Sequence, residues 1–118
     1  MNLKIEKRQL EDGVTLFALS GRIALGRESA DIEPEVIAAL KEGAKLIVLD
    51  LARVSHIDST GIGIMAYCFG KVTQASAGFR VASAQDNVLA VFRVTRLDHV
   101  VPFFPDVDSA LQNSGRLV

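Results

Sequence analysis

The sequence predicts an α/β domain built on one mixed β-sheet with a parallel centre and about four helices. Three observations lead to this fold class. After the first thirty residues or so, apolar runs typical of strands alternate with segments of helical periodicity. The dipeptide Asp12-Gly13, a strong turn signal, separates the first two strand-like runs. The run 46–51 is almost continuously apolar, which is typical of a strand buried on both faces at the centre of a sheet.

The first two strands are expected to form an antiparallel hairpin. Leu3 and Ile5 begin an alternating pattern that stops at the Asp12-Gly13 turn. The run 14–19 beyond the turn is more apolar and is typical of a more buried strand. Glycines then bracket the segment 21–26, which we expect to be a loop.

A first helix is predicted after this loop, because apolar residues recur at helical spacing. These residues are Ile32, Val36, Ile37 and Leu40. Proline is tolerated only in the first turn of a helix, so Pro34 places the helix start near 29–31. Gly43 is a suitable residue to end the helix.

The central strand 46–51 is expected to lead through a polar connection, 55–60, into a second helix. This helix is amphipathic, because its apolar residues lie on one stripe. They are Ile64, Met65, Cys68, Phe69 and Val72. Gly78 ends the connection that follows, and the run 79–82 is expected to be the next strand.

The last part of the chain is expected to contain a third helix, a short strand and a short helix. Asp86 is the expected N-cap of the third helix. Pro102 cannot donate to a ladder, so the short strand 100–104 should lie at an edge or end there. Asp106 or Asp108 is expected to cap the last helix. The resulting order, β-β-α-β-α-β-α-β-α, predicts right-handed parallel crossovers after the hairpin.

Length and composition narrow the classes of function. The 118 residues fit one domain, 1–118, and the net charge of −1 with no basic tract argues against nucleic-acid binding. Cys68 has no cysteine partner, and no Cys/His cluster suggests a metal. The first six residues carry charges, and no apolar run approaches the ~20 residues that cross a bilayer. We therefore expect a cytoplasmic protein without a cofactor or metal.

The segment most able to carry a function is Asp58-Ser59-Thr60-Gly61-Ile62-Gly63. It joins the central strand to the second helix, where parallel α/β proteins usually bind partners or ligands. Helix capping is the simplest local explanation of Ser59, because Asp, Ser and Thr are the preferred N-cap residues. Capping does not explain the glycines, since glycine at Gly63 costs a helix ~1 kcal/mol relative to alanine. Close approach by another backbone or by a partner explains them better.

The same segment and its flanks resemble the signature of STAS domains, in particular the bacterial anti-sigma factor antagonists. The resemblance runs through Leu49-Asp50-Leu51, Val54 and Ile57-Asp58-Ser59-Thr60-Gly61-Ile62-Gly63. Leu19-Ser20-Gly21-Arg22-Ile23 resembles the end of the family's second strand. Val94-Thr95-Arg96-Leu97-Asp98 resembles the segment that closes its third helix. Phe104 with the segment 106–111 resembles its last helix. It therefore covers nearly the whole chain in register.

The resemblance implies a binding protein that catalyses nothing itself. In the family, the serine after the aspartate is phosphorylated by an anti-sigma factor with an ATP-binding kinase fold, and the matching residue here is Ser59. The unphosphorylated antagonist binds the anti-sigma factor and frees the sigma factor, and phosphorylation breaks that complex. Thr60 is the alternative acceptor, and Asp58, Thr60, Gly61, Ile62 and Gly63 would form the docking rim. Some antagonists carry an acid just after the glycine of strand two, whereas this chain has Arg22 there and no acid before Glu28.

Two other classes of function stay open. STAS domains also serve as subunits of signalling scaffolds and as accessory partners of transport ATPases, which would make this chain an adaptor without a phospho-switch. An enzyme or small-ligand binder is the third class. The segment 61–66 fits G-x-G-x-x-A, but the connector before Gly61 is too long for the tight turn of a dinucleotide site. His56, Asp58 and Ser59 lie too close together along one loop to align as a hydrolase relay.

Overall fold

The computed structural model describes residues 3–112. Its strands are β1 (Lys4–Gln9), β2 (Val14–Ile23), β3 (Leu46–Ile57), β4 (Gly78–Ala82) and β5 (Phe103–Phe104). Its helices are α1 (Ile32–Lys41), α2 (Ser59–Gln74), α3 (Asp86–Val94) and α4 (Val107–Gln112), with 3-10 turns at Ser29–Asp31 and Leu97–His99. The predicted order of elements is confirmed.

The five strands form one mixed sheet in the order β1-β2-β3-β4-β5. β1 and β2 pair antiparallel, with Lys4 opposite Ser20 and Gln9 opposite Thr15, while every later pair is parallel. β3 is the central strand, and its residues 46–49 are buried. The predicted hairpin, parallel centre and edge position of the last strand are therefore confirmed.

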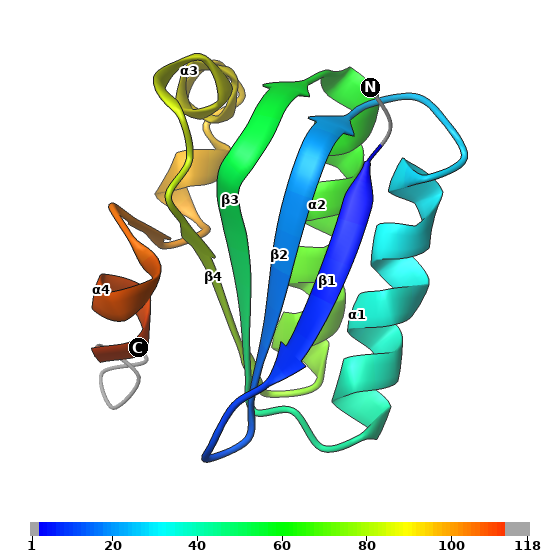
Figure 1. Cartoon of the computed structure of the whole chain (residues 1–118), viewed down its shortest axis with the longest axis vertical. Coiled ribbons are helices and arrows are strands. Elements are labelled where there is room, and N and C mark those ends of the chain that lie inside the picture. The colour runs from blue at the N-terminus through cyan, green and yellow to red at the C-terminus, as the bar shows by residue number, and fades with distance from the viewer. Residues whose placement is uncertain (1–2, 113–118) are drawn as a thin grey trace.

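The two faces of the sheet are covered unequally. α1, α2 and α3 contribute to the larger core cluster, in which Phe17, Leu49 and Phe92 are almost completely buried. α4 covers the other face, where Ala110 joins a smaller cluster with Leu16 and Val48. Figure 1 shows α2 behind the strands, α1 to the right of β1, and α4 at the opposite side, beyond β4.

The first helix begins and ends close to the predicted residues. A 3-10 turn at Ser29–Asp31 leads into α1, and Pro34 lies in the first turn of that helix. Gly43 has φ +98°, and Ala44 N donates to Ala39 O at 3.0 Å across the helix end. This left-handed glycine and its reverse hydrogen bond satisfy carbonyl groups that the last turn leaves free.

Two predicted connections are wrong in part, because β2 and β3 are longer than expected. β2 continues through Gly21 to Ile23, and β3 continues to Ile57, so that Arg22 pairs with His56 and Ile23 with Ile57. The outward side chains of this extension are polar, which made the segments resemble loops. Its inward side chains, such as Ile23, are buried. Asp58 therefore lies at the end of the sheet where β2 and β3 both terminate.

The expected cap of the third helix is also wrong. Gln85 is the N-cap of α3, and Asp86 is its first helical residue, with no capping hydrogen bond from a side chain. Gln85 instead donates to Ala52 O at 2.9 Å, and Asn87 donates to Ser55 O at 2.7 Å. These side chains cover carbonyls on the edge of β3 beyond the end of β4. Asp106 fulfils the other expectation and accepts from Ser109 N at 2.7 Å at the start of α4.

Candidate functional site

The candidate site lies where β2 and β3 end together. Asp58 N donates to Ile23 O at 3.2 Å, directly after the last paired residues of the two strands. β2 then enters the loop to α1, and β3 enters α2 after the single residue Asp58. The start of α2 and the β2–α1 loop are therefore neighbours at one end of the sheet.

Asp58 is the N-cap of α2 and also fastens the β2–α1 loop. Its backbone is extended, and its Oδ1 accepts from Gly61 N at 2.9 Å. Its Oδ2 accepts from Leu25 N at 3.1 Å. The hydrogen bond from Gly61, followed by that from Leu25, lowers the pKa of Asp58 below its ordinary value. One carboxylate thus holds two segments that are 33 residues apart in the sequence.

Ser59 and Thr60 are the first two residues of α2, and both are exposed. The structure overturns the capping explanation of Ser59, because Asp58 makes the capping hydrogen bond. Within residues 3–112, neither hydroxyl has a hydrogen-bond partner. Ser59 Oγ therefore stands on the surface at the amino end of a 16-residue helix.

Gly61 and Gly63 lie in the first turns of α2, and the structure explains glycine differently at the two positions. Gly61 is buried, and a Cβ there would overlap the Ile23 carbonyl oxygen and lie 2.7 Å from Ile57 Cγ1. Gly63 is exposed, and a Cβ there would meet nothing within 4 Å. Close approach by another backbone therefore explains Gly61 but not Gly63. Ile62, between them, is half-buried against the larger core.

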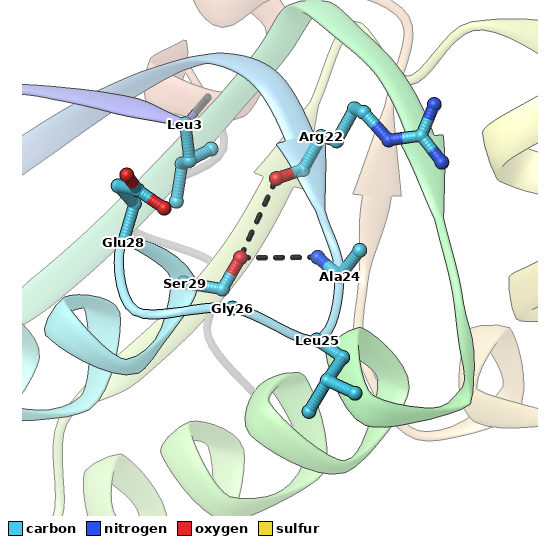
Figure 2. Close-up of a pocket in the computed structure, with 7 residues that line it drawn as sticks. All are labelled: Leu3, Arg22, Ala24, Leu25, Gly26, Glu28 and Ser29. Atoms are coloured by element: carbon cyan, nitrogen blue, oxygen red, sulfur yellow. Dashed lines mark hydrogen bonds between the residues drawn. The ribbon is translucent and has the colours of Figure 1, made fainter. Parts of the chain in front are cut away.

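The β2–α1 loop contains two residues that the sequence did not indicate. Ser29 is buried, and its Oγ accepts from Ala24 N at 3.0 Å and donates to Arg22 O at 3.4 Å. These bonds fix the loop around a pocket of about 230 Å³ (Figure 2). Leu25 is 83% exposed, and Figure 2 shows its side chain directed away from Ser29. Leu25 therefore contributes little to the packing of the domain and leaves an apolar side chain in solvent beside the start of α2.

The remaining sequence candidates stay outside the site. Cys68 is a core residue as expected, and burial, followed by the nearby charge of Glu33, raises the pKa of its thiol to about 12. His56 is an exposed residue of β3 whose Nδ1 lies 3.0 Å from Ser55 Oγ. Among residues 3–112, no group of three or more His, Cys, Asp or Glu side chains is arranged to hold a metal ion. No helix in the described range has the length and apolar character needed to span a bilayer.

Fold and site together define a class of protein, a small α/β domain that presents an unbonded serine hydroxyl at the start of a helix. The chain belongs to the STAS domain family, which matches residues 5–110. The resemblance noted in the sequence is thereby confirmed.

Proteins similar to this chain in sequence include anti-sigma factor antagonists. The anti-sigma-B factor antagonist of Listeria monocytogenes is 29% identical over 107 residues, which cover 86% of this chain and 88% of that protein. The names of such relatives describe regulators, in agreement with the expectation that the chain is not an enzyme.

Solved structures share the fold. The crystal structure of an anti-sigma factor antagonist from Mycobacterium paratuberculosis has a TM-score of 0.82 at 23% identity, covering 96% of this chain and 94% of that one. A sulfate transporter family protein from Wolinella succinogenes has a TM-score of 0.79 at 19% identity, covering 92% and 89%. The fold alone therefore does not separate an antagonist from a transporter-associated domain.

Proposed function

We propose that this chain is an anti-sigma factor antagonist that is switched off by phosphorylation at Ser59. In its unphosphorylated form it binds an anti-sigma factor with a serine-kinase activity, and the bound anti-sigma factor releases a sigma factor. The exposed, unbonded hydroxyl of Ser59 at the start of α2 carries the proposal. The names of the relatives support the choice of partner. We further propose that residues 1–118 act as one STAS domain in the cytoplasm, with a protein and not a nucleic acid as partner.

The proposed docking surface comprises the helix start, with Asp58, Ser59, Thr60, Gly61, Ile62 and Gly63, together with the neighbouring Leu25. Its exposed members are Leu25, Asp58, Ser59, Thr60 and Gly63. Asp58 and Gly61 act mainly by shaping it, because the carboxylate holds Leu25 in place and the missing Cβ lets α2 approach β2. The open space at Gly63 leaves room for the backbone of a partner.

Phosphoryl transfer to this site requires no group from the chain except the acceptor. The Ser59 Oγ forms a bond to the γ-phosphorus of ATP held by the partner, and the bond from that phosphorus to the β–γ bridging oxygen breaks. ADP leaves with the electron pair of the broken bond, and the hydroxyl proton passes to a base of the partner or to water. Thr60 is the alternative acceptor, since its hydroxyl is also exposed. The carboxylate of Asp58 is not needed for the transfer. Its two oxygens accept hydrogen bonds from Gly61 N and Leu25 N, so it serves as the cap of α2.

The phosphate acts on the docked complex without unfolding the domain. It adds about −1.5 to −2 charges at neutral pH. The amino end of α2 tolerates this charge, because its free N–H groups and dipole favour anions. A partner surface fitted to a small hydroxyl would have to desolvate a bulky dianion next to the carboxylate of Asp58, which costs several kcal/mol.

The proposal is tested by identifying the partner and mapping the modified residue. The chain is used to capture proteins from a lysate of its own organism, and mass spectrometry identifies the captured protein and the state of the Ser59 peptide. The purified partner is then incubated with ATP and with the wild type, Ser59→Ala, Thr60→Ala and Thr73→Ala. Thr73 is a matched control, because it is an exposed hydroxyl near the other end of α2.

We expect a kinase-type anti-sigma factor as the partner and a phosphate that is lost only in Ser59→Ala. Label that survives both Ser59→Ala and Thr60→Ala would refute the assigned site. Recovery of a transport ATPase or a large signalling scaffold, with no modification of Ser59, would favour the adaptor function instead.

A further inference from the structure

Part of one face of the sheet lacks a covering helix within residues 3–112. α4 packs on this face near the amino ends of β2 and β3, where Val14, Leu16 and Val48 join its cluster. Figure 1 shows this face of β1, β2 and β3 toward the viewer, with α2 behind the strands and α4 beyond β4. The uncovered part ends where Asp58 caps α2, so it adjoins the start of that helix.

Two irregularities in β3 decide which side chains stand on the uncovered part. The register between β2 and β3 shifts by one residue twice, so that Arg53 lies opposite Ser20 and His56 lies opposite Arg22. Regular pairing continued from the start of the strands would have placed two other residues there, Ala52 and Val54. β-bulges of this kind re-aim side chains and are frequent next to functional sites. Because opposite residues share a face, both bulges here bring a basic side chain onto the face of Arg22.

The backbone at both bulges is held by side chains. Gln85 Nε2 donates to Ala52 O at 2.9 Å, and Asn87 Nδ2 donates to Ser55 O at 2.7 Å. Ser55 Oγ donates to Gly21 O at 3.2 Å. Carbonyl groups that the interrupted ladder leaves free therefore have donors. The bulges are thus stable parts of the fold, and the two basic residues that they re-aim have fixed positions on the sheet.

Four basic residues gather on this part of the sheet, and we call them the basic surface: Lys4, Arg22, Arg53 and His56. Lys4 of β1 lies opposite Ser20, so it stands in the same row as Arg53. All four basic residues are exposed. In the part of the chain that the structure describes, the charged groups of Lys4, Arg22 and Arg53 form no ion pair.

The acids beside the basic surface are engaged with other groups. Glu6 and Asp50 lie in the next row of the same face. Glu6 Oε2 pairs with Arg8 at 3.0 Å, and Asp50 Oδ1 accepts from a backbone N–H at 3.0 Å. The carboxylate of Asp58 is likewise bonded to backbone N–H groups. The end of the sheet beside Ser59 therefore carries an excess of positive charge, which is complementary to acidic side chains of a partner.

We propose that the basic surface binds an acidic segment of the anti-sigma factor while that protein covers Ser59. This inference rests on the proposed function, since it adds a second contact of the same partner. The two surfaces are continuous, because only two residues separate His56 from Ser59 in the chain. The guanidinium groups of Arg22 and Arg53 donate to carboxylates of the segment, in the paired geometry that arginine and carboxylate favour. Exposed charges act mainly on the rate of association, because they steer the partner before contact.

The rate at which the purified anti-sigma factor associates with the chain, measured by surface plasmon resonance, tests this inference. Arg22→Gln/Arg53→Gln removes two charges of the basic surface. Lys41→Gln/Lys45→Gln removes two exposed charges near the other end of β3 and is the matched control. At ~50 mM NaCl we expect the first variant to associate at least ~5-fold more slowly than the wild type, and the control to stay within ~2-fold. The difference should fade at ~500 mM NaCl, where salt screens exposed charges.

A variant that keeps the charges separates their effect from an effect on folding. Arg22→Lys/Arg53→Lys should recover most of the lost rate, and all variants should keep the circular dichroism of the wild type. Association of the glutamine variant at the wild-type rate, with Ser59 still phosphorylated, would overturn this inference and leave the proposed function standing. If no kinase-type anti-sigma factor binds the wild type, the proposed function and this inference fail together.

Other polyanions are the competing occupants of the basic surface. The wild type is therefore also titrated with poly(U) RNA and with phosphatidylglycerol vesicles, and we expect no saturable binding of either. Binding of one of them that Arg22→Gln/Arg53→Gln abolishes would assign the basic surface to that polyanion and contradict the acidic segment.

Discussion

Asp58 Oδ2 accepts a hydrogen bond from the backbone N–H of Leu25 at 3.1 Å, while the other oxygen of the same carboxylate caps α2. The aspartate before Ser59 thus has a structural task in this chain that is distinct from partner contact. It sets the position of Ser59 relative to the β2–α1 loop. The docking surface that we propose is therefore built by one carboxylate and by the close packing of Gly61 on β2.

Removal of the Asp58 carboxylate should destabilise the fold. Asp58→Ala loses the cap of α2 and the tie to Leu25, so the free energy of unfolding should fall by about 1 kcal/mol, within the range of about 0.5–2 known for N-caps. Asp58→Asn keeps an oxygen for Gly61 N and should lose less. Urea denaturation followed by circular dichroism measures both. Equal stability of Asp58→Ala and the wild type would contradict the structural role.

The stabilisation by Asp58 should depend on pH in one direction. Its hydrogen bonds lower its pKa in the folded state below the ordinary value of 3.8. A depressed folded pKa gives stability that is present above the unfolded value and is lost as the pH falls through the folded pKa. The difference in unfolding free energy between the wild type and Asp58→Ala should therefore be constant near neutral pH and shrink below about pH 3.8. A difference that grows in acid would be inconsistent with this linkage.

Alanine at Gly61 should destabilise the protein. The added Cβ would overlap the Ile23 carbonyl, a backbone atom that cannot turn away, so β2 and α2 must separate. Strain of this kind costs about 1–3 kcal/mol. The measurement is the same urea titration, and a stability equal to or above that of the wild type would mean that α2 does not approach β2 as closely as the structure shows.

Alanine at Gly63 should have the opposite effect on stability. The site has open space, so Gly63→Ala should raise the unfolding free energy by up to about 1 kcal/mol through helix propensity. It should also weaken binding of the anti-sigma factor, because a methyl group would enter the docking surface. Gly70→Ala, which also has open space and lies two turns further along α2, is the control for stability without a binding defect. Binding unaffected by Gly63→Ala would remove this residue from the docking surface.

Much of the fold could be predicted because local patterns and tertiary structure agree. Three local patterns each favour a single type of structure. They are the turn at Asp12-Gly13, the buried strand at 46–51 and the helix whose spacing includes Val36. The ends of β2 and β3 could not be predicted, because polar side chains face solvent on paired backbone such as that of Arg22 and His56.

The sequence located the helix start of the site, but it did not reveal what holds the start in place. The bond from Leu25 to Asp58 joins residues far apart in the chain, and no local pattern encodes it. Arg80 was overlooked for a similar reason. An arginine in a strand is usually solvated, whereas Arg80 is 2% exposed, donates to Ala110 O and has its guanidinium over the Phe104 ring. A possible signal was its position within the wholly buried strand Gly78–Ala82.

The affinity of the purified anti-sigma factor for the two forms of the chain tests the central claim most directly. Calorimetric titration would compare the unphosphorylated protein with the same protein carrying phosphate on Ser59. We expect the phosphorylated form to bind at least ~100-fold more weakly, which corresponds to about 2.8 kcal/mol, while its unfolding free energy changes little. Equal affinity of the two forms would contradict the account.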